Sequence, residues 1–236
     1  MYYAVSSPST TENPEAGARG ERSFVGVVAT EADCVVEFTP TAMASAFIAR
    51  GQRLVHSPGV LFRSPPLPKD TVIFLHSEDD LTGTKVTGTC YLSVITGHQC
   101  AFYPANVQSC DGILEQIPPT ETWGFNFFLS PLAKRQSAGY RFIAGADNTV
   151  VTRRCNGSEP DTFTLAQGGH FREVLVNVPT YCHVESNQPL LVAQYSLGHL
   201  YGGVNDIFAD PFVTLIAPVG QFNNCLLYTS PSPRDS

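Results

Sequence analysis

The sequence predicts an all-β protein made of two tandem β-sandwich-like units, which derive from an internal repeat and are stapled by disulfides. Short runs rich in Val, Ile, Phe and Tyr recur along the chain between turn clusters of Ser, Pro, Gly, Asp and Asn, the pattern of a sandwich or barrel. The 18 prolines and 19 glycines leave little room for long helices. The best helix candidate, Thr41–Arg50, can also be read as a loop followed by a strand.

The order of these runs divides the chain into five parts. Residues 1–21 are polar and are expected to form a loose N-terminal segment. Residues 22–98 form the first β unit, residues 99–138 a connecting segment and residues 139–224 the second β unit. Residues 225–236 change abruptly in character and resemble a translated adapter sequence, with a natural Ser/Pro-rich linker as the alternative. The adapter interpretation makes Cys225 foreign and leaves six native cysteines, an even number.

An internal repeat supports the division into two units. Residues 24–36 align without gaps with residues 139–151, an offset of 115 residues, and in both copies a strand leads through a small acidic turn into a second strand. Two shorter correspondences follow in the same order, 49–54 with 166–171 and 74–78 with 183–187. Each unit is therefore expected to run hairpin, glycine turn, strand, polar turn, strand. Coincidence between generic β patterns is the alternative.

Cysteine spacing and one glycosylation acceptor point to an oxidising compartment. The disulfide candidates are Cys34, Cys90, Cys100, Cys110, Cys155 and Cys182, and no CxxC pair supports a zinc ribbon or a thioredoxin-like motif. We expect Cys34 to pair with Cys90, Cys100 with Cys110 and Cys155 with Cys182, although other pairings of six cysteines remain open. Asn156 begins an Asn-Gly-Ser acceptor, for which chance is the alternative. These features predict a secreted, extracellular protein.

Composition and motifs argue against several function classes. The net charge of −7 without a basic run is unsuited to nucleic acid. No stretch approaches the roughly 20 apolar residues of a membrane span, and the N-terminus lacks the features of a signal peptide, so a secreted protein is expected to begin upstream. No HExxH, GxSxG or P-loop motif is present. We therefore expect no catalytic residues, no metal site and no cofactor.

The centre of the chain carries a specific motif. It comprises Cys110-Asp111, then Glu115, Gln116, Pro118 and Pro119, then Trp123-Gly124, and finally Pro131-Leu132-Ala133. This succession resembles the N-terminal domain family of IgG Fc-binding proteins, and the likeness extends over about residues 22–223. The resemblance implies a secreted, mucus- or matrix-associated glycoprotein. Independently of it, the paired prolines favour an extended connection, and the tryptophan is large enough to fill a junction between two sandwiches.

These inferences predict an extracellular protein-binding or adhesive module of a secreted mucus or matrix glycoprotein, non-catalytic, with a protein or glycoprotein ligand of unknown identity. Loops 101–109 and 198–206 are the expected contact sites, because loops on a rigid sandwich carry recognition. Two alternatives remain, a hydrolase-like enzyme on a β scaffold and a purely structural spacer. A hydrolase would require paired acids or a metal site in the folded structure.

Overall fold

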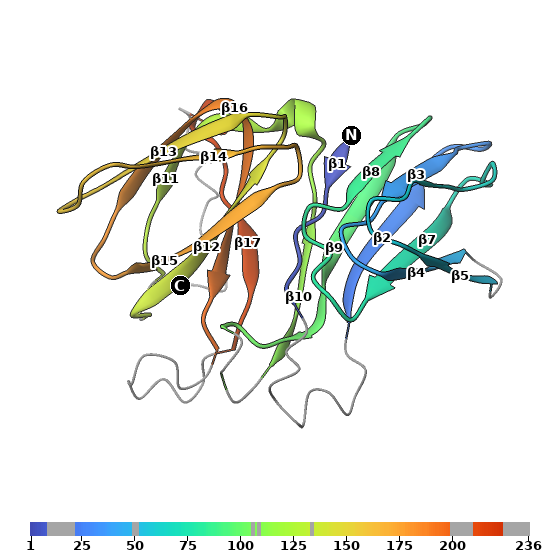
Figure 1. Cartoon of the computed structure of the whole chain (residues 1–236), viewed down its shortest axis with the longest axis horizontal. Coiled ribbons are helices and arrows are strands. Elements are labelled where there is room, and N and C mark those ends of the chain that lie inside the picture. The colour runs from blue at the N-terminus through green and yellow to red at the C-terminus, as the bar shows by residue number, and fades with distance from the viewer. Residues whose placement is uncertain are drawn as a thin grey trace, which may run out of the picture.

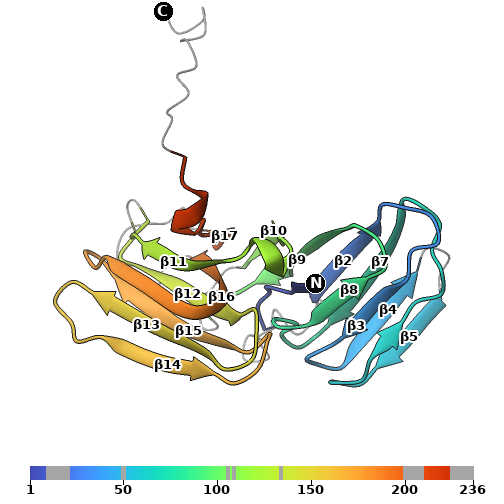
Figure 2. The ribbon, with the colours of Figure 1, turned by 90° about the horizontal axis from the view of Figure 1, so that it is seen from above.

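The computed structural model describes residues 1–8, 22–48, 52–104, 107, 110–132, 135–198 and 210–223, with the backbone alone for residues 52–54. Within these residues the regular structure is all strand, apart from the short 3₁₀ turns η1 (Thr120–Thr122) and η2 (Val219–Gln221). The predicted all-β class is confirmed. Figure 1 shows two β lobes side by side, and Figure 2 shows the same division from above, with the N-terminus between the lobes.

The first lobe packs a four-stranded sheet against a six-stranded sheet. The smaller sheet has the order β1 (Tyr2–Tyr3), β8 (Lys85–Gly88), β3 (Val36–Thr39) and β6 (Phe62–Arg63). The larger has the order β10 (Asp111–Gln116), β9 (Leu92–Ala101), β2 (Ser23–Ala29), β7 (Thr71–Ser77), β4 (Ala44–Ile48) and β5 (Gln52–His56). Alternate side chains such as Val25 and Val27 of β2 face Phe38 of β3 in one fully buried core. The residues considered for a helix, Thr41–Arg50, thus contain strand β4.

The second lobe is organised around one long strand, β16 (Cys182–Ser196). Its first half pairs with β11 (Gly124–Leu129) and β13 (Thr149–Cys155), and β14 (Asp161–Leu165) extends that sheet beyond β13. Its second half pairs with β12 (Ser137–Ala144) and β17 (Val213–Leu215), and β15 (Phe171–Asn177) lies beyond β12. Pro189 lies where the partners of β16 change from β11 and β13 to β12 and β17, and its carbonyl accepts a hydrogen bond from the Gly145 N–H.

The two lobes share one strand-pairing scheme. Strand β2 lies between β7 and β9 as β12 lies between β15 and β16, and β3 lies between β6 and β8 as β13 lies between β14 and β16. Asp33 and Asn148, which the 115-residue offset equates, both have positive φ, 58° and 55°. The shared scheme is consistent with two tandem units. The β4–β5 hairpin is the part of the first unit without a counterpart among the described strands of the second.

The details of the repeat differ from the expectation. The first strand–turn–strand segment is not a hairpin, because β2 and β3 belong to different sheets and β12 does not pair with β13. The proposed match of 74–78 with 183–187 is wrong in topology, since the counterpart of β7 is β15 and not β16. Of residues 49–54, residues 52–54 belong to β5, which pairs with β4, and residues 49–51 are outside the described residues.

The expected segments at the ends and centre of the chain are also corrected. Residues 1–8 are not loose, because β1 pairs with β8 and Tyr3 to Ser7 are almost fully buried. The polar composition of residues 1–21 predicts a loose segment, but Ser6 is buried because distant residues supply its hydrogen-bond partners. Segment 99–138 is more than a connection: β10 completes the first unit and β11 the second, and residues 117–123 join them. Residues 9–21 and 225–236 lie outside the described part of the chain.

Three disulfides close the loops of this framework. Cys34 pairs with Cys90, Cys100 with Cys110 and Cys155 with Cys182, with Cα–Cα distances of 5.5, 5.0 and 4.0 Å. These are the pairs expected from the sequence. The third joins directly opposite residues of β13 and β16, so it fastens two neighbouring strands near their ends. Closing loops of this kind typically stabilises a fold by about 2–4 kcal/mol each.

The units are joined by a buried guanidinium, that of Arg141 on β12. Its Nη1 donates to the Ser6 carbonyl at 2.8 Å and lies 2.9 Å from the Asp80 carboxylate, both in the first unit. Its Nε and Nη2 donate to one oxygen of Glu173 on β15 at 2.9 and 2.7 Å. The Tyr195 hydroxyl also donates to the Ser6 carbonyl, at 2.7 Å. The side chain of Arg141 is only 4 % exposed, so these bonds replace its hydration.

The backbones of the two units approach each other closely beside the Arg141 guanidinium. Gly83, before β8, and Gly169, before β15, both have φ of +84° and face one another across the units. A Cβ at Gly169 would lie 2.7 Å from the Gly83 carbonyl oxygen, a distance that real Cβ atoms do not adopt. Glycine is therefore required there both for its conformation and for the closeness of the two units.

We predict that Arg141→Met lowers the free energy of unfolding by about 3–5 kcal/mol, because Asp80 and Glu173 then remain partly buried without their counter-charge. Urea denaturation followed by circular dichroism measures the change. The matched control is Arg154→Met, which removes a surface ion pair to Glu185 and should cost no more than about 1 kcal/mol. Equal losses in the two variants would contradict a special role for Arg141.

Candidate binding pocket and inter-unit junction

The central sequence motif lies at the junction between the units. Trp123 follows η1, is 6 % exposed, and its indole Nε1 donates to the Pro118 carbonyl at 3.0 Å. Its ring centroid lies 6.1 Å from that of Tyr3, which belongs to the N-terminal strand. Pro119 has extended backbone angles of −66° and 148° immediately before η1. The tryptophan therefore packs inside the junction, where it also lines a small pocket of about 180 Å³ with Pro118 and Pro218.

The acidic member of the motif bridges strands of the two units. Glu115 on β10 accepts hydrogen bonds from the Leu215 N–H and the Thr214 hydroxyl of β17, while burial raises its pKa above the usual value. Its neighbour Gln116 is exposed, and its amide lies 3.4 Å from the Ser93 hydroxyl. A Cβ added to Gly124 would overlap Pro218. The motif residues thus have structural contacts with one another and with β17.

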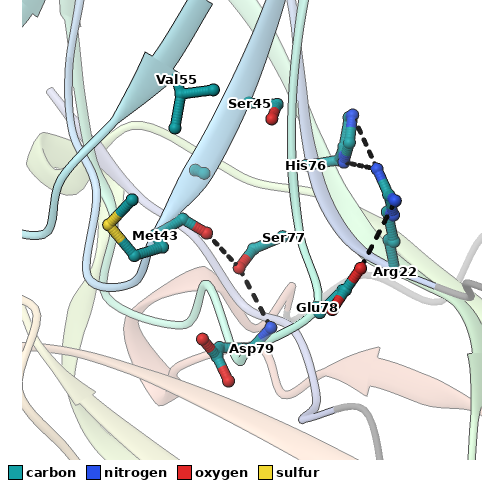
Figure 3. Close-up of a pocket in the computed structure, with 9 residues that line it drawn as sticks. Arg22, Met43, Ser45, Val55, His76, Ser77, Glu78 and Asp79 are labelled. Carbon is teal, nitrogen blue, oxygen red and sulfur yellow. Dashed lines mark hydrogen bonds and ion pairs between the residues drawn. The ribbon is translucent and has the colours of Figure 1, made fainter. Parts of the chain in front are cut away.

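A polar pocket of about 200 Å³ lies beside the hairpin that distinguishes the first unit (Figure 3). Its walls are β4, β5, the end of β7 and the residue before β2. Its lining residues are Arg22, Met43, Ala44, Ser45, Val55, His76, Ser77, Glu78 and Asp79. Met43 and Val55 are 49 % and 61 % exposed at the rim, so apolar surface adjoins the polar groups.

Arg22 is held in this pocket from two sides, as Figure 3 shows. Its Nη1 lies 2.8 Å from Nδ1 of His76, and its Nη2 lies 3.5 Å from Oε1 of Glu78. Nη1 also lies 3.3 Å from Nε2 of the same ring, and because a guanidinium can only donate, the ring nitrogen that bonds to it accepts. The imidazole is itself fixed by stacking on Phe47, at 4.9 Å between ring centroids. The cation is therefore oriented before any ligand arrives, with its side chain 32 % exposed.

One of the two serine hydroxyls in the pocket, that of Ser77, is already engaged in hydrogen bonds. Ser77 Oγ donates to the Met43 carbonyl at 2.6 Å and accepts from the Asp79 N–H at 3.0 Å. These bonds fix the turn after β7 and direct the hydroxyl away from His76. The arrangement suits recognition of an anionic or carbonyl group through Arg22, with apolar contacts at the rim.

Sequence reasoning did not find this pocket. Arg22 and His76 are 54 residues apart and meet because Ser23 of β2 pairs with Ser77 of β7. The only available signal was a charged residue directly before a strand, which has no specificity. The loops expected to bind ligand, 101–109 and 198–206, fall largely outside the described residues, which include only 101–104, 107 and 198 of them.

The remaining candidate residues have defined surroundings. Asn156 lies exposed in the turn between β13 and β14, and its Oδ1 accepts from the Tyr181 N–H at 2.6 Å. His183 stacks on Phe128 at 5.0 Å, and Glu185 pairs with Arg154. In the described part of the chain, no group of three or more His, Cys, Asp or Glu side chains is placed to hold a metal ion. The same part contains no helix long and apolar enough to cross a membrane.

One histidine lies in the interior of the first unit. His98 on β9 is 1 % exposed, and its Nδ1 accepts from the Cys100 N–H at 3.1 Å. Burial lowers the pKa of His98 from 6.5 to about 4, against an opposing influence of Asp80. The imidazole is therefore neutral in the folded protein at neutral pH.

Comparison with known proteins gives one family. A family model described as "IgGFc binding protein" matches residues 1–236. The IgGFc-binding protein of Homo sapiens is 27 % identical over 148 residues, which are 63 % of this chain and 3 % of that protein. The chain thus spans a small fraction of the length of this relative. No solved structure matches the chain.

We predict that acid destabilises the protein through His98. The unfolded chain binds a proton to this residue below pH 6.5, whereas the folded chain does so only near pH 4, so the free energy of unfolding falls as the pH decreases between these values. The loss attributable to His98 is about 3 kcal/mol. Urea denaturation at neutral pH and near pH 4 measures it, and His98→Gln should show a smaller difference. Identical pH dependence in both proteins would contradict the assignment.

Proposed function

Because the chain belongs to the IgGFc-binding protein family, we propose that it is an extracellular, non-catalytic binding module of a secreted mucus or matrix glycoprotein. The observation that carries the proposal is the pocket in which His76 and Glu78 orient Arg22 beside exposed apolar side chains. The name of the human relative refers to the Fc part of IgG, and the ligand of this chain is not taken from that name.

The covalent framework supports an extracellular location. The three disulfides of the described residues are typical of chains that fold in an oxidising compartment. Asn156 is exposed in a turn, where a glycan attached to its amide nitrogen extends into solvent. Both features fit a secreted glycoprotein.

The chemistry of the pocket supports a protein ligand that carries an acidic side chain next to apolar residues. Arg22 offers a charge-assisted hydrogen bond to a carboxylate, and Met43 and Val55 offer apolar contact on the same rim. Glu78, which shares the guanidinium, is largely exposed and is free to turn toward solvent when an incoming carboxylate replaces it.

The rigidity of the scaffold supports adhesion over catalysis. The turn that follows β7 is fixed without a ligand by the bonds of Ser77 and by the ion pair of Asp80 with Arg141, so less conformational entropy is lost on binding. Within the pocket, the Ser77 hydroxyl is bonded to the Met43 carbonyl and to the Asp79 N–H, which fixes the turn after β7.

We predict that Arg22→Gln weakens ligand capture about tenfold, because one charge-assisted hydrogen bond is lost. The chain, secreted by cultured cells, is immobilised and exposed to mucus or matrix extract, bound proteins are identified by mass spectrometry, and their affinities are measured with purified components. Arg63→Gln is the matched control, since Arg63 is exposed and its ion pair among the described residues is with Glu37, 3.6 Å away. A ligand whose affinity Arg22→Gln leaves unchanged would refute the role of the pocket.

We predict that the secreted chain carries an N-linked glycan at Asn156. Enzymatic deglycosylation should decrease the mass of the wild-type chain by one glycan, and Asn156→Gln should remove that change. Peptide mass spectrometry locates the modification. A secreted, folded chain with unmodified Asn156 would contradict the prediction.

A further inference from the structure

Strand β15 lies at an edge of the second unit and pairs only with β12 among the described strands. The Val178 N–H bonds to the Gln136 carbonyl at the end of this ladder. In an antiparallel ladder, hydrogen-bonded residue pairs alternate with pairs that are not hydrogen-bonded. Arg172, Val174 and Val176 therefore also direct their backbone N–H and C=O groups toward β12. Glu173 and Leu175 therefore direct their N–H and C=O groups away from β12, toward the edge.

The first unit shows what such an edge accepts. Its corresponding strand, β7, pairs with β2 on one side and with β4 on the other, through Ser45–His76, Ala46–Leu75, Phe47–Phe74 and Ile48–Ile73. The covering strand is antiparallel and uncharged, with the sequence Ala-Ser-Ala-Phe-Ile. The second unit keeps the same scheme and lacks a described equivalent of β4. An added antiparallel strand thus has a precedent within this molecule.

The edge carries few features that prevent strand addition. Proteins commonly protect edges with bulges, prolines or uncompensated charges. Strand β15 pairs with β12 over seven consecutive residues without a register shift, and its second half is Val-Leu-Val-Asn. Its two charges are neutralised within the chain, Arg172 by Asp161 at 3.3 Å and Glu173 by Arg141 at 2.7 Å. An incoming strand therefore needs no charge of its own.

A cavity of about 200 Å³ lies alongside the edge. Leu175, Val176, Asn177 and Thr180 line one side, and Arg153, Cys155, Ser158, Glu159 and Asp161 line the other. Arg153 bonds to Asp161 at 3.2 Å, yet its buried Nε has no hydrogen-bond partner. Glu159 has no ion-pair partner among the described residues. With Arg172 also bound to Asp161, these four charges sum to zero, so the cavity suits a neutral side chain.

A side-chain carboxamide fits these two groups. Its carbonyl oxygen accepts from a donor such as Arg153 Nε, and its NH₂ donates to an acceptor such as Glu159. In strand-addition sites, main-chain bonds supply affinity and flanking cavities select alternate side chains. The open edge and the cavity together have both parts of such a site.

We propose that the edge of β15 binds an extended, uncharged segment of a partner polypeptide as an added antiparallel strand, with an Asn or Gln side chain in the adjoining cavity. This site is separate from the Arg22 pocket of the first unit. Loss of binding at one site therefore leaves the other intact, and the two proposals fail independently.

Hydrogen exchange of the whole secreted chain tests the proposal, with a capped synthetic peptide of alternating Val and Thr and one central Asn as the probe. The peptide should slow exchange of the Glu173 and Leu175 amides at least about tenfold, because these groups become bonded. Leu175→Pro removes one outward donor without removing a bond to β12 and should abolish the protection of Glu173. Leu175→Ala, which keeps the donor, should retain it.

A change in the peptide tests the proposal without depending on the folding of a protein variant. Replacing the Asn of the peptide by Val should weaken binding to the wild-type chain about tenfold, because Arg153 Nε and Glu159 then face an apolar group.

Unchanged exchange in the wild-type chain at high peptide concentration overturns the proposal, as does protection that survives Leu175→Pro. Edge amides already protected without peptide also overturn it. In that case, dependence on protein concentration identifies a second copy as the occupant, and independence identifies another part of the same chain.

Discussion

The burial of one guanidinium constrains the whole arrangement. Arg141 belongs to the second unit, yet it is neutralised by Asp80 of the first unit and by Glu173 of its own sheet. Burial alone would lower its pKa, and the surrounding Tyr195, Asp80 and Glu173 raise it, so the side chain stays charged. A charge of this kind cannot be left without partners in a low-dielectric interior. The N-terminal segment, the loop before β8 and strand β15 must therefore come together at one point, which places the two units relative to each other.

The sequence allowed prediction of those features that depend on local pattern. The β-branched runs indicated most of the long strands, and the order of the cysteines indicated the pairs that the structure forms. It did not indicate that Ser6 would be buried, because the groups that bond to it, Thr82, Arg141 and Tyr195, lie far along the chain. The Arg22 pocket was missed for the same reason. The burial of Ser6 and the Arg22 pocket both depend on the register between strands that are far apart in the sequence. A single sequence does not specify that register.

Two units with one pairing scheme provide two different surfaces. In the first, the β4–β5 hairpin covers the edge of β7 and creates a pocket in which Arg22 is oriented toward solvent. In the second, no described strand occupies the same position in the scheme, so β15 has outward backbone groups beside a charge-balanced cavity. The first surface depends on a side chain and the second on the main chain. Among the described strands, one additional hairpin in the first unit therefore changes which groups are exposed at this edge, while the pairing scheme of the core is kept.

The short turn η1 has a mechanical consequence for the folded chain under tension. The Thr120 N–H bonds to the Met1 carbonyl, and the Thr122 carbonyl accepts from the side chain of Gln221. A pulling force applied through residues 1 and 221 thus enters the molecule at one place, between the lobes. Tension would first shear the few bonds around η1, while the outer strands carry little load. The loops closed by the disulfides 34–90, 100–110 and 155–182 cannot extend even after the hydrogen bonds around η1 break.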